Sequence, residues 1–310
     1  MKRIGHIACG LALAALLPGV LFESPLTNQA DFTISDNVNL VLLDVSVKDS
    51  NAAYVLGLEK SNFRVLEDGK QRAITQFGSV DAPVTVGLVV DNSGSMRSKR
   101  SEVLQAGMSF ARESNKNDEF FVVNFNNSVV PGLPPQTPFT DNLQSLQNAL
   151  YFGRPTGQTA LYDAVSYSLR HLESAHHEQR TLIIVSDGGD NVSKIPLGDL
   201  VAQIQSSRVT IYTIGLMDPD NRDLKPGVLR RIATVSGGAY FQPRTLEDVP
   251  LIFAQISKDI RHRYTVGFVP DEEHDKRIIR SVKVIAERAG ERLICKSRSI
   301  YRIPPPAGKV

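Results

Sequence analysis

The sequence predicts an α/β fold, in which a doubly wound, mostly parallel sheet is inserted between two β-rich segments. Residues 84–90 (VTVGLVV) and 181–185 (TLIIV) are almost continuously apolar, which is typical of strands buried on both faces. Between residues 83 and 262 such runs alternate with segments of helical spacing. This alternation favours a parallel sheet covered by helices on both faces.

The elements expected within the α/β region follow one another in a regular order. The expected strands are residues 84–90, 119–125, 181–185, 209–214 and 239–241. The expected helices are residues 97–114, 143–150, 161–172, 197–204, 228–235 and 246–260. Each buried strand is followed by at least one amphipathic segment, as a doubly wound sheet requires.

The flanking segments have β pattern without helices. Residues 38–47, 63–66 and 73–80 precede the α/β region, and a turn is expected at residues 67–70. Residues 264–269, 278–286 and 292–297 follow it, with a hairpin turn expected at Ala289-Gly290-Glu291. Because each set needs a hydrophobic partner, we expect residues 31–82 and 263–303 to form the two halves of one small β-sandwich. The α/β domain then spans residues 83–262, and residues 304–310 form a Pro-rich tail.

The N-terminus has the pattern of an export signal. Lys2 and Arg3 precede residues 4–22, which carry no formal charge. Residues 1–30 are therefore expected to be a signal peptide cut after Ala30, or an uncleaved N-terminal anchor. The protein is expected in the periplasm or outside the cell, held at the inner membrane if the anchor stays. After cleavage the one remaining cysteine is Cys295, expected to be a small buried hydrophobe.

Composition excludes one class of partner. The net charge of the 310 residues is only +2, whereas nucleic-acid binding needs a concentrated basic face. No nucleic acid is expected as a partner, and a membrane only through the N-terminal anchor.

Three loops with hard oxygen donors stand where strands end or helices begin. Asp91, Ser93 and Ser95 follow the strand at 84–90, Thr159 precedes the helix at 161–172, and Asp187 follows the strand at 181–185. Ligands in open α/β sheets bind at the carboxyl ends of the strands. Two carboxylates and three hydroxyls suit a small divalent cation, which prefers oxygen ligands. A remaining coordination position would favour an anionic group from a partner.

These loops resemble the metal-ion-dependent adhesion site of the von Willebrand factor type A domain. Residues 91–96 (DNSGSM), 157–161 (GQTAL) and 186–188 (SDG) are similar to its three motifs. Over residues 83–262 the resemblance implies a six-stranded sheet with one antiparallel edge strand. It also implies Mg²⁺, Mn²⁺ or Ca²⁺ as cofactor, held by Asp91, Ser93, Ser95, Thr159 and Asp187. Residues 58–63, 67–70 and 264–268 resemble the flanks of a bacterial subgroup.

Simpler interpretations exist for several of these residues. Asp followed by Ser is common at helix N-caps, and Thr159 could cap the helix that follows it while also being a ligand. His171, His176 and His177 lie near a helix end without sharing one face, so a metal role is not expected. Residues 218–223 (DPDNRD) resemble a calcium loop but lack its Gly and Glu, which favours a solvated turn.

The sequence therefore predicts a metal-dependent protein-binding module of an exported bacterial protein, with a partner that offers a carboxylate. The main alternative is a structural envelope protein in which the metal only stabilises the loops. A metal-dependent enzyme is not expected, because Asp91 and Asp187 are committed to the ion and no general base accompanies them. The sequence also lacks a nucleophile elbow, a Walker loop and a Cys/His zinc pattern.

Overall fold

The computed structural model describes residues 40–78, 82–187, 189–216, 226–271 and 277–303. The expected signal or anchor at residues 1–30, the expected turn at 218–223 and the tail at 304–310 lie outside these residues. In the described part of the chain, none of the helices combines the length and hydropathy needed to cross a membrane.

A six-stranded sheet forms the centre of the α/β region. Its strands are β5 (Val84–Asp91), β6 (Glu119–Phe125), β7 (Val129–Pro131), β8 (Gln179–Ser186), β9 (Thr210–Gly215) and β10 (Tyr240–Phe241). They are ordered β10-β9-β8-β5-β6-β7, and only β7 is antiparallel to its neighbour. The predicted fold class, including the antiparallel edge strand, is confirmed.

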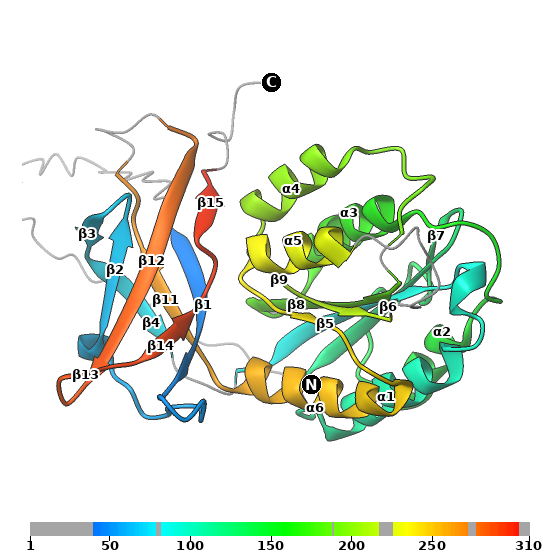
Figure 1. Cartoon of the computed structure of the whole chain (residues 1–310), viewed down its shortest axis with the longest axis horizontal. Helices are drawn as coiled ribbons and strands as arrows, with labels where there is room; N and C mark the ends of the chain where they lie inside the picture. Colours follow the sequence, from blue (N-terminus) through cyan, green and yellow to red (C-terminus); the bar gives the residue numbers. More distant parts are fainter. Residues whose placement is uncertain (1–39, 79–81, 188, 217–225, 272–276, 304–310) are drawn as a thin grey trace, which may run out of the picture. The chain divides into compact units, whose positions relative to one another are not determined.

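Helices cover both faces of this sheet, as Figure 1 shows. One face packs against α1 (Arg100–Glu113), α2 (Leu143–Tyr151) and α6 (Val249–Arg261). The other packs against α3 (Leu161–His171), α4 (Leu197–Ser206) and α5 (Pro226–Ser236). Because the sheet is buried on both sides, every residue of β5 is buried, as its continuous apolar run predicts.

The flanking β segments pair with each other in two antiparallel sheets. One has the order β14-β1-β11-β4 and the other β13-β12-β2-β3, with β15 also pairing with β12. The strands before the α/β region are β1 (Val41–Lys48), β2 (Phe63–Glu67), β3 (Lys70–Arg72) and β4 (Ile74–Gly78). Those after it are β11 (Arg263–Phe268), β12 (Ile279–Arg288), β13 (Glu291–Arg292), β14 (Ile294–Lys296) and β15 (Ile300–Arg302).

Both sheets contribute to a single hydrophobic core, which makes the arrangement a sandwich. Val45 of β1 and Tyr264 of β11 pack with Val65 of β2 and Val284 of β12 in this core. Cys295 is half-buried at its edge, and burial raises the pKa of its thiol.

Several expected boundaries were wrong for local reasons. Strand β3 begins at Lys70, inside the expected turn, because the actual turn is the two residues Asp68 and Gly69, both with positive φ. This is the backbone of a tight hairpin turn. The second hairpin also turns on two residues, Ala289 and Gly290. Strands β3, β7 and β15 were missed, since three residues are too few to show an alternating pattern.

Candidate metal centre

The predicted site residues lie at the carboxyl edge of the central sheet. Asp91 is the last residue of β5, and Asp187 directly follows β8. Strand β5 lies between β6 and β8 in the sheet. After β5 the chain adds β6 and β7 on one side of it, and then adds β8 on its other side. Ligands of doubly wound sheets bind at such a switch point.

Hydrogen bonds join the three predicted loops into one unit. The amide of Gly94 donates to the carbonyl of Gly157 at 3.1 Å, which joins the first loop to the threonine loop. The hydroxyl of Ser186 donates to Oδ2 of Asp91 at 2.6 Å, which joins the first loop to the end of β8. Thr159 donates its amide to Oδ1 of Asn191 at 2.9 Å, so the threonine loop is held to the segment after Asp187.

Asp91 is a fully buried carboxylate. Its Oδ1 accepts a bond from the amide of Ser93 at 2.8 Å, in addition to the Ser186 bond to Oδ2. Burial raises the pKa of Asp91 to about 6; these hydrogen bonds oppose the rise, and the charge of Asp187 adds to it. A cation placed beside Asp91 would favour its charged form.

Ser93 and Ser95 present their hydroxyls to each other, with 3.1 Å between the Oγ atoms. Ser93 precedes a 3₁₀ turn, η2 (Gly94–Met96), but its side chain makes no capping bond. Helix α1 begins only at Arg100, not at residue 97 as expected, because this turn intervenes. The helix-cap interpretation of the Asp-x-Ser pattern therefore does not account for the Ser93 hydroxyl.

Thr159 does not cap the helix that follows it, which removes that alternative interpretation. The N-cap of α3 is Ala160, and no side chain bonds from that position. The first amides of the helix are instead bonded by neighbours from the next loop: Tyr162 donates to Asp190 and Asp163 donates to Ser193, both at 3.1 Å. Thr159 is a buried residue, and its hydroxyl thus has no capping role.

Asp187 supplies the clearest test of whether a cation fits. The residue is 4% exposed, and its Oδ2 is buried without a hydrogen-bond partner among the described residues. A buried carboxylate oxygen without a partner is unfavourable. Two carboxylates and three hydroxyls are also the donor types that hard divalent cations prefer. The residues present therefore fit such an ion.

Three further residues shape this region, although their roles were not predicted from the sequence. Ser186 orients Asp91, Asn191 holds Thr159, and Asn127 accepts the amide of Gln158 at 2.8 Å. Asn127 also restricts Gly157, where φ is +81° and an added Cβ would lie 1.9 Å from the Asn127 side-chain oxygen. Ser186 stands within the SDG motif, but no sequence pattern marks the two asparagines.

The histidines lie in other environments. His171 contacts Phe121 and Phe139 and bonds the carbonyl of Pro138 at 3.0 Å, whereas His176 pairs with Glu119 at 2.7 Å. Within the described ranges, no group of three or more His, Cys, Asp or Glu side chains could hold a metal ion. A centre rich in hydroxyls, like the one described above, is a different type of site.

Comparison with known proteins identifies the domain. The family model for the von Willebrand factor type A domain matches residues 85–255. The chain belongs to this family. The matched range includes all five predicted ligand positions, and it lies within the range 83–262 expected for the α/β domain.

Individual relatives are distant. The chain is 29% identical over 117 residues to the uncharacterized protein YwmC of Bacillus subtilis (strain 168), an alignment that covers 37% of this chain and 50% of YwmC. The chain thus spans about half the length of that curated relative.

The fold of this chain is similar to that of solved structures. A von Willebrand factor type A protein from Catenulispora acidiphila is similar with a TM-score of 0.53 at 14% identity, over 80% of this chain and 76% of the other. The von Willebrand factor domain of the type V pili tip protein Mfa5 from Porphyromonas gingivalis gives a TM-score of 0.49 at 14% identity, over 59% and 96%.

Proposed function

We propose that this protein is a metal-dependent protein-binding module, exported from a bacterial cell, that captures a carboxylate of its partner. The site would hold Mg²⁺, or Mn²⁺ or Ca²⁺, through Asp91, Ser93, Ser95, Thr159 and Asp187. The ion would supply an open coordination position for the partner's carboxylate oxygen.

One observation carries the proposal. The oxygen-bearing side chains stand on three loops that are hydrogen-bonded to one another, yet their polar atoms are not all satisfied there. Ser93 and Thr159 do not use their hydroxyls as helix caps, and Asp187 has a buried oxygen without a partner among the described residues. These observations, the Asp187 oxygen above all, support coordination of a group from outside the chain.

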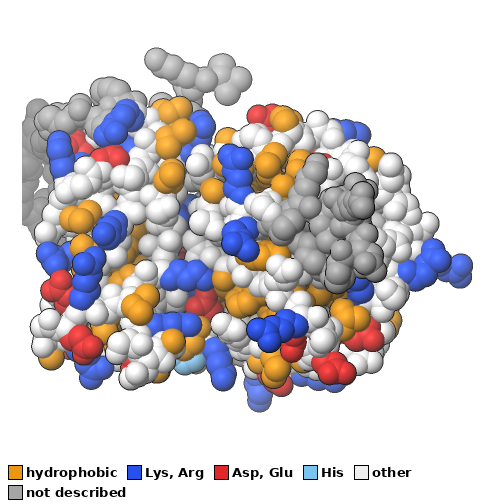
Figure 2. Space-filling model, viewed as in Figure 1, with side chains coloured by type: hydrophobic (Ala, Val, Ile, Leu, Met, Phe, Trp, Pro, Cys, Tyr) orange, Lys and Arg blue, Asp and Glu red, His pale blue; other side chains and the backbone are white. Residues whose placement is uncertain are grey.

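The surface beside the site supports an acidic partner. Arg97 and Arg154 are exposed on neighbouring loops, which touch where the guanidinium of Arg97 donates to the carbonyl of Pro155 at 3.4 Å. Neither arginine forms an ion pair with a described residue. Unpaired cations beside a binding site raise the encounter rate with an anionic partner. On the face shown in Figure 2, Lys and Arg side chains lie scattered among other types, without one continuous basic patch.

Metal titration tests the first half of the proposal. Calorimetry with Mg²⁺ and Mn²⁺ should show one site in the wild-type chain and none in Asp91→Asn. The matched control is Asp199→Asn, an exposed carboxylate in the first turn of α4, which should bind the ion as the wild type does. Equal binding by Asp91→Asn would exclude the proposed ligand set.

Partner capture tests the second half. A protein retained from envelope extract in Mg²⁺ should be lost in EDTA and with Asp91→Asn, and retained by Asp199→Asn. Retention that is independent of metal would contradict capture through the ion. Metal binding without any metal-dependent partner would instead favour a structural role for the ion.

A further inference from the structure

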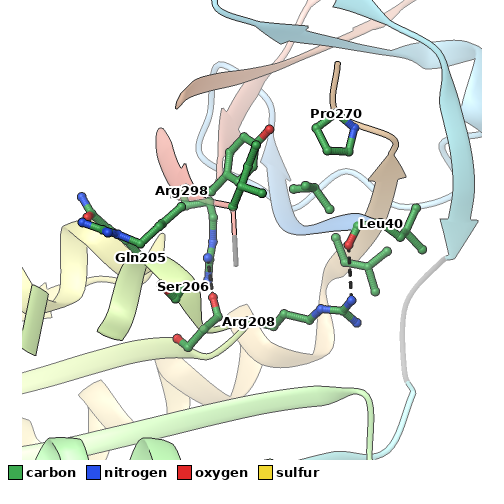
Figure 3. A pocket seen from close by; sticks show the side chains of 12 residues that line it. Leu40, Gln205, Ser206, Arg208, Pro270 and Arg298 are labelled. Atoms are coloured by element: carbon green, nitrogen blue, oxygen red, sulfur yellow. Dashed lines mark hydrogen bonds between the residues drawn. The ribbon is translucent and has the colours of Figure 1, made fainter. Parts of the chain in front are cut away.

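A second polar cavity lies away from the candidate metal centre. It has a volume of about 210 Å³ and is lined by residues 40–42, by residues 205–208 at the end of α4, by Pro270, and by residues 298 and 301–303. Figure 3 shows Arg298 and Arg208 entering it from different segments. Three of the lining residues are arginines and none is acidic.

Arg298 is a buried cation, and no carboxylate of the described residues forms an ion pair with it. It is only 8% exposed, and its guanidinium donates to the carbonyls of Ser207 at 2.5 Å and Val209 at 3.4 Å. Burial lowers the pKa of Arg298 to about 10; the charge of Asp44 opposes this shift and that of Arg208 adds to it. Asp44 forms no ion pair with Arg298 and instead lies 4.0 Å from Arg263. Buried charges are unfavourable unless they are paired.

The other two arginines also have unused donors. The Nε of Arg302, in β15, is buried and has no hydrogen-bond partner among the described residues. Arg208 donates to the carbonyl of Leu40 at 3.3 Å, and its contact with Glu178 is 3.7 Å long and exposed. Such an exposed contact contributes little. The three arginines thus bring more positive charge to the cavity than the carboxylates of the described residues neutralise.

We propose that this cavity binds a small organic carboxylate. A guanidinium has five N–H donors in a planar fork that matches a carboxylate. In the described part of the chain, Arg298 donates to two carbonyls only. Leu40, Leu42, Pro270 and Ile303 supply apolar walls beside the three cations. Because of these walls and the small volume, a carboxylate on a short apolar body fits better than inorganic phosphate, which has no apolar part.

Isobutyrate is a suitable probe, compared with phosphate and with chloride at equal ionic strength. Binding is measured by calorimetry and by the midpoint of thermal unfolding, because a ligand bound only by the folded state raises that midpoint. EDTA is present throughout, so that a carboxylate cannot bind through a metal ion at Asp91. The test is therefore independent of the proposed function.

Two variants each remove one cavity arginine, Arg302→Gln and Arg208→Gln. Arg208 lies at the surface, so its substitution puts folding least at risk. The control variant is Arg231→Gln, which removes one positive charge at an exposed position of α5. We expect wild type and Arg231→Gln to bind isobutyrate at millimolar concentration, and each cavity variant to bind roughly tenfold more weakly or worse.

Three outcomes would overturn the proposal. The first is no binding of isobutyrate beyond the effect of chloride, which would leave the arginines a purely structural role. The second is binding of phosphate alone, and the third is equal isobutyrate affinity in wild type and both cavity variants.

Discussion

At the scale of single residues, Asp91 is the group through which we expect the metal-free site to respond to pH. Its folded-state pKa of about 6 lies above the ordinary value of 3.8. Between these values the folded state binds the proton more tightly than the unfolded state, so the free energy of unfolding falls as pH rises. The shift corresponds to at most about 3 kcal/mol.

We therefore expect metal-free wild-type protein to lose stability, relative to Asp91→Asn, as pH rises from about 4 to about 6. Saturating Mg²⁺ should remove this loss, because the cation favours the carboxylate. Urea unfolding of both proteins at each pH, with Mg²⁺ or EDTA, provides the measurement. Identical pH profiles for wild type and Asp91→Asn would show that Asp91 is not the titrating group.

Asp187 gives a second prediction for a single residue. Its buried Oδ2 has no hydrogen-bond partner among the described residues, so in EDTA the variant Asp187→Asn should be close to the wild type in stability, or above it. In Mg²⁺ the order should reverse, because only the wild type gains from the ion. Thermal unfolding in both buffers checks this. Equal stabilisation of both proteins by Mg²⁺ would contradict a ligand role for Asp187.

At the scale of elements, the end of α6 is held by a buried cluster of charged and phenolic groups. Asp259 of α6 accepts hydrogen bonds from Tyr212 of β9 and, at 3.0 Å, from Tyr54, and it lies 3.4 Å from Arg263 at the start of β11. Burial disfavours its carboxylate, but the charges of Arg263 and Lys296 and the hydroxyl bonds hold its pKa below the ordinary value.

Removing the charge of Asp259 should lower the stability of the folded protein. In Asp259→Asn the buried Arg263 would keep, among the described residues, only Asp44 at 4.0 Å as a counter-charge. We expect a loss of about 3 kcal/mol in the free energy of unfolding, measured by urea unfolding at neutral pH. The exposed Asp199→Asn should change it by less than about 0.5 kcal/mol. A loss no larger in Asp259→Asn than in this control would show that the cluster adds no stability.

Elements differed in how well the sequence predicted them. Strand β5 was expected because a continuous apolar run indicates burial on both faces, and helix α6 because apolar residues at helical spacing indicate burial on one face. The start of α1 was misplaced because the turn at Gly94–Met96 follows the geometry of the candidate site rather than helical periodicity. The five predicted ligand positions meet at one edge of the sheet, whereas Asn127 and Asn191 were missed. Side-chain bonds between distant loops leave no periodic signal.

At the scale of the whole molecule, the sandwich couples the two ends of the described chain. Strand β1 pairs with β11, and β2 pairs with β12, across the entire α/β region. A chain ending at residue 262 would leave β1 to β4 without most of their partners. We expect limited proteolysis to cut residues 40–78 rapidly in that truncated chain and slowly in the full chain. Equal protection in both would mean that the N-terminal strands fold without their partners.

The most direct test of the central claim is the anomalous scattering of Mn²⁺ in crystals of this protein. We expect one strong peak within about 2–2.5 Å of the hydroxyl oxygens of Ser93 and Ser95, with Thr159 and the two aspartates around it. This peak should disappear in Asp91→Asn. A peak elsewhere in the molecule, or none at saturating Mn²⁺, would contradict the metal centre.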